Sequence, residues 1–212
     1  YIGGAVTDIL QKTNHSIRVY DSLLYESEYR KLVDFVQGDI RDRTRLKTHL
    51  EWADAVIWLA ALVADGSCAL YPELAIELNQ ASVRWLAEHF DGRIIFPSTC
   101  LVYAIKNEAL DENSAKNPST IYTKTKLAAE EFLKDKNSLI VRLSTVFGVG
   151  DLFSRPRFDL VVNLLTARAV TEGKMTVFGG QQFRPFIHVR DVALTMVANI
   201  DTEHTGIFNL HT

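Results

Sequence analysis

Cysteine, long hydrophobic runs and an excess of charge of one sign are all scarce in this chain. Its two cysteines, Cys68 and Cys100, are too few and too far apart for a disulfide framework or a cysteine metal site, which suits a reducing compartment. No apolar run approaches the ~18 residues that a membrane-spanning helix needs, and no signal peptide opens the chain. The net charge of −3 and the pI near 6.1 give no reason to expect a nucleic acid or an anionic membrane as partner. We therefore expect a cytoplasmic protein without a metal site.

The rest of the composition is typical of a globular α/β protein. With 212 residues, 47% of them hydrophobic and 23% charged, the chain is long enough for a sizeable core. Strand-like and helix-like apolar patterns alternate along it, which predicts a doubly wound parallel sheet with ligands at the carboxyl ends of its strands. The expected strands are 16–20, 34–37, 55–61, 94–98, 138–143, 175–178, 185–189 and 206–210, and the expected helices are 4–12, 44–50, 72–90, 118–134, 160–170 and 191–199.

Tyr122 and Lys126 are the first candidates for chemistry. They are four residues apart on a predicted helix, so both side chains leave the same face, one turn apart. Each unit by which a phenol pKa falls requires roughly 1.4 kcal/mol of selective stabilisation of the phenolate. The lysine cation and a second nearby positive charge can supply it, so the spacing predicts Tyr122 as an acid/base group at neutral pH.

The surroundings of this pair resemble a known family. The resemblance is carried by the runs Phe96–Tyr103, Asp111-Glu112, Ile121–Lys126 and Arg184–Ala193. Together they are similar to the extended short-chain dehydrogenase/reductases, the NAD-dependent nucleotide-sugar epimerase/dehydratase family. The resemblance implies a catalytic triad of Thr99, Tyr122 and Lys126. It also implies a Rossmann-like NAD-binding domain over 1–146 that lacks its first strand, a partial substrate lobe over 147–212, and a chain incomplete at both ends.

NAD is the expected cofactor. An acidic residue at the tip of the second strand, Asp21, can accept hydrogen bonds from a ribose and would repel a 2′-phosphate, so it favours NAD over NADP. The small residues Ala60 and Ala61 would let a flat cofactor pass close to the backbone. The resemblance implies further cofactor contacts at Ile2, Gly3, Asp39, Ile40, Asn79, Tyr122 and Lys126.

A nucleotide-diphosphate sugar is the expected substrate. The resemblance places the diphosphate on Arg184, and the sugar beside Thr99 and Thr145, although many family members carry asparagine where Thr145 stands. Arg157 precedes a predicted helix, so it suits a diphosphate, but it is equally compatible with a solvated basic loop. Asp159 could cap that helix. His188 is interpreted as a packing or hydrogen-bonding residue.

The residues after Thr99 narrow the reaction. Sugar dehydratases and decarboxylases of this family carry acidic residues there, whereas this chain has Cys100 and Leu101, which cannot shuttle protons to the neighbouring carbon. The remaining chemistry is hydride transfer at one carbon, so we expect an enzyme that epimerises nucleotide sugars through a transient keto sugar. A nucleotide-sugar dehydrogenase or ketoreductase, a small-carbonyl reductase and a catalytically inactive member of the fold remain alternatives.

The apolar surface of two helices suggests assembly. Trp85 on helix 72–90, and Phe132 among other apolar residues on helix 118–134, exceed what one core stripe needs. Resembling enzymes often dimerise by packing these two helices as a four-helix bundle, so a homodimer is expected. Alternatively, a C-terminal segment beyond Thr212 covers the same surface.

Overall fold

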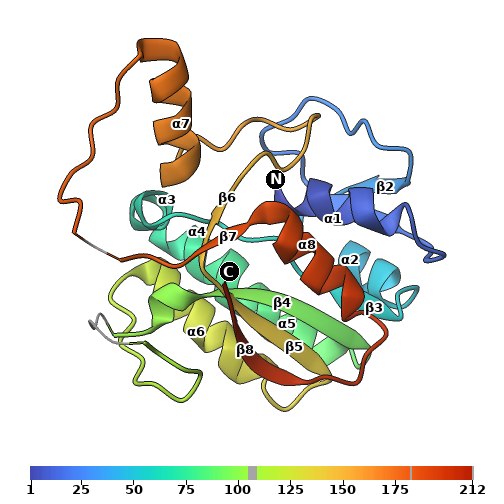
Figure 1. Ribbon diagram of the computed structural model, residues 1–212. Helices are drawn as coiled ribbons and strands as arrows, with labels where there is room; N and C mark the ends of the chain where they lie inside the picture. The colour runs from blue at the N-terminus through green and yellow to red at the C-terminus, as the bar shows by residue number, and fades with distance from the viewer. Residues whose placement is uncertain (105–108, 182, 212) are drawn as a thin grey trace.

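A parallel four-stranded sheet lies at the centre of the protein (Figure 1). The computed structural model describes residues 1–104, 109–181 and 183–211. The sheet has the order β3 (Ala55–Ile57), β4 (Arg93–Thr99), β5 (Ser138–Leu143) and β8 (Gly206–Leu210). In its register, Thr99 lies opposite Leu143, and Leu143 lies opposite Leu210, so the carboxyl ends of three strands meet at one edge.

Two smaller parallel pairs flank this sheet. One joins β1 (Arg18–Asp21) to β2 (Asp34–Gln37), and the other joins β6 (Thr145–Phe147) to β7 (Phe186–His188). Every strand pair in the described residues is parallel, apart from an isolated antiparallel bridge between Tyr103 and Lys116. The predicted limits of β2, β5 and β8 agree with the structure.

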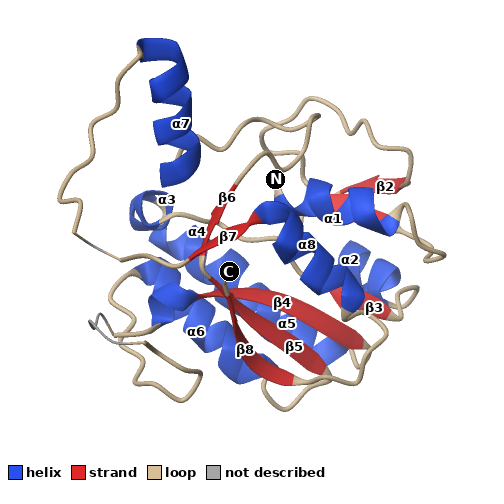
Figure 2. Cartoon of the chain, in the orientation of Figure 1, coloured by secondary structure: helices blue, strands red, loops and turns tan. Residues whose placement is uncertain are grey.

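Helices cover both faces of the central sheet (Figure 2). One face packs against α1 (Ile2–Leu10) and α8 (Val189–Ala198), and the other against α2 (Arg43–Leu50), α5 (Ser82–His89) and α6 (Ile121–Leu133). Side chains alternate along a strand, so in β4 Ile94 and Phe96 belong to the α5/α6 core, whereas Ile95 belongs to the α1/α8 core. A strand that is apolar on both faces is buried on both faces, and this confirms the doubly wound fold.

The predicted helix 72–90 is interrupted in its middle. It consists of α4 (Pro72–Ile76), a π-helical turn (Glu77–Ala81) and α5. A short helix that the sequence pattern did not indicate, α3 (Asp65–Leu70), precedes it. π-helical turns often occur at functional sites, and this one carries Asn79.

Several predicted helix starts were off by one to three residues, and the cap of α6 explains the largest difference. Helix α6 begins at Ile121 instead of Pro118, because Thr120 caps it: the Thr120 hydroxyl accepts the backbone N–H of Thr123, and the Thr123 hydroxyl donates to the Thr120 carbonyl. Helix α7 (Val161–Glu172) begins without a side-chain cap. Asp159 does not cap it, because its carboxylate pairs with a guanidinium two residues earlier in the chain.

Two predicted strands differ from the structure by more than one or two residues at their ends. β3 ends at Ile57 instead of residue 61, although Trp58 still donates its N–H to the Ile95 carbonyl. Residues 175–178 form no strand; they are exposed and lie in the connection after α7. Helix α7 itself stands away from the central sheet, and its described residues include none that is buried (Figure 1). An alternating pattern makes a strand only when a neighbouring strand is present to pair with it.

The apolar surface predicted at Trp85 is not there. Trp85 is only 9% exposed, belongs to the α5/α6 core and stacks on His89 with ring centroids 4.5 Å apart. Phe132 is partly buried against the same core. The homodimer through helices 72–90 and 118–134 therefore stays a prediction, without Trp85 as its support.

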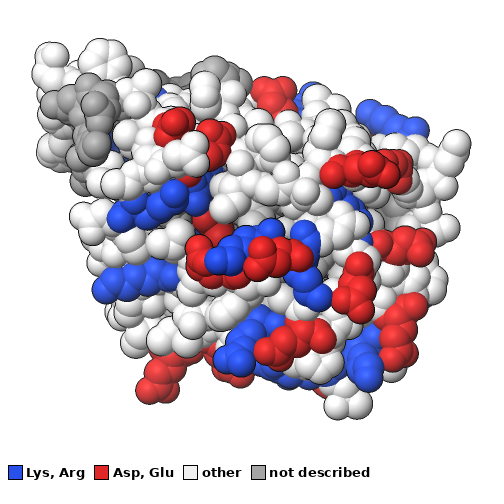
Figure 3. Space-filling view, turned by 90° about the horizontal axis from the view of Figure 1, so that it is seen from below, with Lys and Arg blue, Asp and Glu red and all other residues white. Residues whose placement is uncertain are grey.

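The surface carries charges of both signs. On the face in Figure 3, Lys and Arg side chains lie interspersed with Asp and Glu side chains. The exposed ion pairs of the described residues include Arg84 with Glu88 and Lys134 with Glu131. Within the described part of the chain, every helix is too short or too polar to cross a lipid bilayer.

Candidate active site

Thr99 ends β4 at the carboxyl edge of the central sheet. All seven residues of β4 are buried, and Thr99 is 6% exposed. Its hydroxyl oxygen accepts the backbone N–H of Leu101 at 3.2 Å, which starts a 3-10 turn over Cys100–Val102. A hydroxyl that accepts one bond in this way still has its hydrogen to donate. Thr99 is thus held in place with a donor at the edge where ligands bind in parallel α/β sheets.

Tyr122 lies in the first turn of α6, beside this edge. Burial, together with smaller electrostatic contributions from Cys68, Asp65 and Cys100, raises the pKa of its phenol to about 12, whereas Arg157 opposes this change. The phenol pKa was expected to be lowered by Lys126, and this was wrong for the protein without ligand, because the loss of water outweighs the positive charge nearby. The same set of charges places Tyr122 close to the residue that follows Thr99.

Lys126 is deeply buried one turn further along α6. Only 4% of it is exposed, and its ammonium nitrogen lies 3.9 Å from the centre of the Phe96 ring. Burial lowers the pKa of Lys126 to about 7, and the Glu130 carboxylate partly opposes that change. At neutral pH, therefore, Lys126 is less fully protonated than an exposed lysine, which limits its effect on Tyr122.

Helix α3 adds groups that the sequence pattern did not reveal. Asp65 and Cys68 both act on the charge state of Tyr122. Burial raises the pKa of the Cys68 thiol, and its sulfur donates to the Leu62 carbonyl at 3.3 Å. A six-residue helix shows too little periodicity to be found in a sequence, so only the proximity of these residues to α6 identifies them.

Asn79 fixes the loop that follows β3. Its side-chain oxygen accepts the backbone N–H of Leu62 at 2.8 Å, and its side-chain nitrogen donates to the Leu62 carbonyl at 2.8 Å. Asn79 is 1% exposed, so water does not reach this place. The Asn79 amide supplies the hydrogen bonds that the backbone groups of Leu62 would otherwise lack. Ala60 and Ala61 lie half-buried in the same loop. The residue predicted to contact a cofactor thus fixes the loop that contains Ala60 and Ala61.

The other residues predicted to bind the cofactor lie around α1, β1 and β2. Ile2 and Gly3 form the first turn of α1, and a methyl group on Gly3 would lie 3.4 Å from the Leu59 side chain. Asp21 is exposed at the end of β1, where its carboxylate accepts the Leu23 N–H at 2.8 Å.

Asp39 and Ile40 follow β2 and differ in environment. The Asp39 carboxylate pairs with Arg41 at 2.6 Å, and hydrogen bonds from Arg41 hold the pKa of that carboxyl below its ordinary value. Ile40 is 9% exposed and packs in the core with Leu46 and Leu50. In this structure Ile40 therefore serves mainly as a core residue.

A carboxylate covers the start of α1. The side chain of Asp151 lies so close to Gly4 that a β-carbon there would collide with it, and Asp151 also pairs with Lys31 at 3.3 Å. Lys31 forms a second ion pair with Asp8. The N-terminal end of a helix favours negative charge, so this end of α1 already attracts an anionic group.

The predicted substrate residues come from three separate segments. Arg157 pairs with Asp159 at 2.5 Å and lies 5.7 Å from the centre of the Tyr1 ring. Its charge acts on Tyr122, and the charge of the exposed Arg184 acts on Cys100, so both arginines lie toward the carboxyl edge of β4. Thr145 begins β6, half-buried, and donates its backbone N–H to the Pro185 carbonyl at 3.1 Å.

His188 contributes to structure, as its position in the sequence predicted. Its side-chain nitrogen accepts the backbone N–H of Arg190 at 3.2 Å and so caps α8. A β-carbon on Gly148, which has φ of +104°, would collide with the His188 ring. Both residues therefore serve the local backbone.

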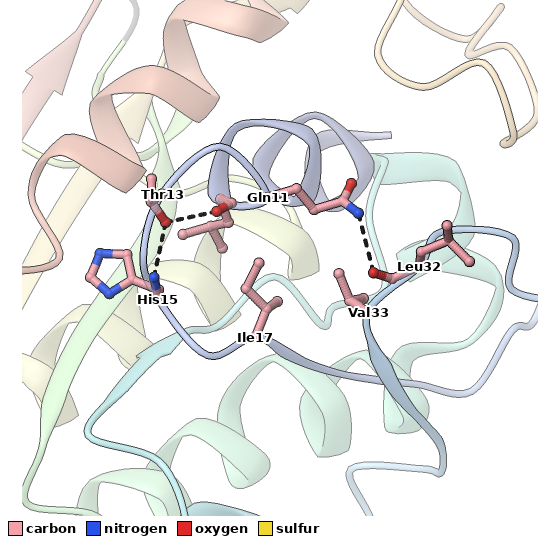
Figure 4. Close-up of a pocket in the computed structure, with 7 residues that line it drawn as sticks. Gln11, Thr13, His15, Ile17, Leu32 and Val33 are labelled. Carbon is pink, nitrogen blue, oxygen red and sulfur yellow. Dashed lines mark hydrogen bonds between the residues drawn. The ribbon is translucent and has the colours of Figure 1, made fainter.

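A surface hollow lies apart from these residues (Figure 4). It is lined by Leu10, Gln11, Thr13, His15, Ile17, Leu32 and Val33. Gln11 donates to the Leu32 carbonyl across it at 3.3 Å. None of the residues predicted to bind cofactor or substrate lines this hollow. As for metals, the described residues contain no group of three or more His, Cys, Asp or Glu side chains that could hold an ion.

Comparison with known proteins connects this geometry to one family. An uncharacterized UDP-glucose epimerase of Bacillus subtilis (strain 168) is 29% identical over 171 residues, which are 75% of this chain and 52% of the relative. A putative UDP-glucose 4-epimerase of Methanocaldococcus jannaschii is 27% identical over 210 residues, 91% of this chain and 68% of the relative. This chain thus spans about half the length of the first relative.

Solved structures support the fold. The UDP-glucose 4-epimerase of Thermus thermophilus, solved with NAD, superimposes with a TM-score of 0.84 at 20% identity, over 100% of this chain and 75% of that one. The sequence model of the NAD dependent epimerase/dehydratase family matches residues 1–210. Because that match covers nearly the whole sequence, the chain belongs to the NAD dependent epimerase/dehydratase family.

Proposed function

We propose that the full-length protein is an NAD-dependent enzyme that epimerises a nucleotide-diphosphate sugar. The observation that carries this proposal is the meeting of Tyr122 and Lys126 on α6 with the carboxyl end of β4, where Thr99 stands. The charge of Arg157 acts on Tyr122, and the charge of Arg184 acts on Cys100, the residue after Thr99. A proton-transferring group, a hydroxyl donor and two cations suit a sugar hydroxyl attached to a diphosphate.

The residues present fit NAD. Gly3 leaves room beside Leu59 that a larger side chain would fill, and the Asp21 carboxylate is exposed at the end of β1, where a ribose hydroxyl could donate to it. Asn79 holds the neighbouring loop through both backbone groups of Leu62. The residues that would hold the cofactor are Ile2, Gly3, Asp21, Asp39, Ile40, Ala60, Ala61, Asn79, Tyr122 and Lys126. When bound, NAD supplies the acceptor and donor of a hydride.

The protein's own groups would handle the proton. Tyr122 would take the proton of a sugar hydroxyl as the carbonyl of a transient keto sugar forms, and would return it when the hydroxyl is restored on the other face. Thr99 would donate a hydrogen bond to the same oxygen. The high phenol pKa of Tyr122 in the absence of ligand, about 12, means that Tyr122 starts as a proton donor. Positive charge bound beside it would be needed to make it a base.

The residue beside Thr99 restricts the reaction. Burial raises the pKa of the Cys100 thiol, so this side chain is neutral and offers no base for a neighbouring carbon. Elimination and decarboxylation need such a group, and epimerisation does not. This supports epimerisation, and the names of the two relatives, both UDP-glucose epimerases, point to a uridine diphosphate sugar.

Product analysis tests the proposal. The full-length protein would be incubated with NAD and, in separate reactions, with UDP-glucose and UDP-N-acetylglucosamine, and the sugars separated by chromatography. An epimerase gives the 4-epimer without net accumulation of NADH. Stoichiometric NADH would instead show a dehydrogenase, and absence of turnover with every nucleotide sugar would contradict the proposal.

Three further features remain proposals. The division into an NAD-binding domain, 1–146, and a substrate lobe, 147–212, follows the family pattern; residue 212 lies outside the described residues. A cytoplasmic location follows from the scarcity of cysteine. A homodimer through helices 72–90 and 118–134 is tested by light scattering of Ile76→Glu, because Ile76 is 46% exposed on α4. A dimer weakened by this change supports the interface, and a monomeric wild type contradicts it.

A further inference from the structure

A row of polar side chains crosses the central sheet one residue before its carboxyl edge, where Thr99 lies. In the register of the sheet, Ser98 lies opposite Arg142, and Arg142 lies opposite Asn209. Each is one residue before the carboxyl end of its strand, where Thr99, Leu143 and Leu210 stand. Because side chains alternate, Ser98 and Arg142 share the face of Phe96 and Ile140, which is the face covered by α6.

Glu130 of α6 joins this row from above. Arg142 donates to its carboxylate from Nε at 3.1 and 3.2 Å and from Nη2 at 2.6 Å, and the Ser98 hydroxyl donates to the same carboxylate. The Glu130 and Arg142 side chains are each 1% exposed. Charges this deeply buried persist only when they are paired and hydrogen-bonded, so the pair determines how α6 can lie on the sheet.

The row also holds the segment that leads from β4 to α6. Arg142 donates from Nη1 to the Tyr103 hydroxyl at 2.8 Å and to the Glu112 carbonyl at 3.1 Å. The Tyr103 hydroxyl donates to the Asn209 side chain at 2.6 Å, and the Asn209 backbone N–H donates to the Glu112 carboxylate at 2.6 Å. Two points of the connection between Thr99 and Tyr122, one near its start and one near its middle, are therefore attached to the same arginine.

Glu130 stands one turn from Lys126 on the same face of α6. The Lys126 ammonium lies over the Phe96 ring, and the Glu130 carboxylate accepts a hydrogen bond from the Ser98 hydroxyl. The two side chains therefore contact alternate residues of β4. Of the charged groups on α6 and the elements packed against it, the Glu130 carboxylate is the one that raises the pKa of Lys126. The other titratable groups on α6 and on the described elements packed against it are Asp65, Cys68, Glu73, Glu77, Arg84, Glu88, His89, Arg93, Cys100, Tyr122, Lys124, Glu131 and Arg142.

We propose that Glu130, held by Arg142 and Ser98, is a positioning residue: it fixes α6 against β4 and provides the counter-charge of Lys126. This inference rests on the proposed function, since it concerns the geometry of Thr99, Tyr122 and Lys126. It adds a role to a buried ion pair that is not among the residues proposed to hold the substrate or the cofactor.

Three variants of the full-length protein separate positioning from stability. Glu130→Gln keeps the shape and removes the charge; Glu130→Gln with Arg142→Met removes both charges, so no buried charge stays unpaired. Glu131→Gln is the matched control, because Glu131 is the next residue of α6 and forms an exposed ion pair with Lys134. The expected result is a fall in kcat of at least about tenfold in the first two variants, with KM for the nucleotide sugar changed less than about threefold, and no change in the control.

A second measurement does not depend on turnover. The pH dependence of urea unfolding, compared with and without Lys126→Met, reports the proton affinity of Lys126 in the folded protein without ligand. Repeating the comparison in the presence of Glu130→Gln should show that affinity reduced at least about tenfold. If the wild type turns over no nucleotide sugar, the proposed function fails. The unfolding measurement still shows whether Glu130 raises the proton affinity of Lys126.

Two results would overturn the inference. One is an unchanged proton affinity of Lys126 in Glu130→Gln. The other is a double variant that folds stably and turns over at the wild-type rate, since Glu130 and Arg142 would then contribute stability alone.

Discussion

Removing the Lys126 ammonium should stabilise the protein without ligand, and by an amount that depends on pH. Lys126 has an ordinary pKa of 10.5, and burial lowers this pKa to about 7 in the folded protein. Between these values the unfolded chain binds a proton that the folded chain releases, so wild-type stability rises with pH through this window. Below pH 7 the group lowers the free energy of unfolding by its full amount, about 5 kcal/mol for a shift of this size. Lys126→Met removes this contribution and keeps an unbranched side chain of similar length.

Urea unfolding at pH 7, 8 and 9 measures the effect. Lys126→Met should be more stable than the wild type at pH 7, and the difference between the two free energies should shrink by about 2 kcal/mol by pH 9. Other groups titrate in the same range, but they do so in both proteins and cancel in the difference. Lys124→Met serves as control, because Lys124 is exposed on the same helix and its replacement removes no buried charge.

A difference between Lys126→Met and the wild type that stays constant from pH 7 to 9 would refute this reasoning. It would mean that the Lys126 ammonium keeps its proton in the folded state, through a counter-charge stronger than the one Glu130 provides. A variant less stable than the wild type at pH 7 would have the same meaning.

Three other predictions concern the site. Tyr122→Phe should abolish turnover and leave NAD affinity nearly intact, because it removes only the oxygen that transfers the proton; wild-type rates would contradict this, and titration calorimetry checks the binding. Asp21 should make the full-length protein prefer NAD to NADP by at least about tenfold, roughly 1.4 kcal/mol, and Asp21→Ala should reduce that ratio in a fluorescence-quenching titration, whereas equal affinities in the wild type would be contrary. Asn79→Leu should lower the free energy of unfolding by about 1–3 kcal/mol, because both backbone groups of Leu62 lose their partner; an unchanged midpoint in urea would argue against it.

Features that depend on a few neighbouring residues could be read from the sequence. The limits of β2, β5 and β8, and the parallel doubly wound order, follow from local periodicity and from the alternation of helices with strands. The placement of Tyr122 and Lys126 on one face of α6 follows from helix geometry alone. His188, interpreted from the sequence as a packing or hydrogen-bonding residue, has its hydrogen-bond partner only two residues away.

The environment of those residues was decided by contacts between distant segments. Periodicity shows that Lys126 leaves the helix beside Tyr122, but its pKa depends on the Phe96 ring and on how much water the fold removes. Trp85 looked like surplus apolar surface until the core around α5 and α6 buried it.

The row from Ser98 through Arg142 to Asn209 is the clearest example of contacts that the sequence pattern does not reveal. Its members are far apart in the chain and become neighbours only through the register of three strands. A local pattern determines which way a side chain points, because that depends on backbone dihedrals near it. Burial, ion pairing and pKa depend on the partners that the side chain meets, and only the tertiary structure brings those partners together.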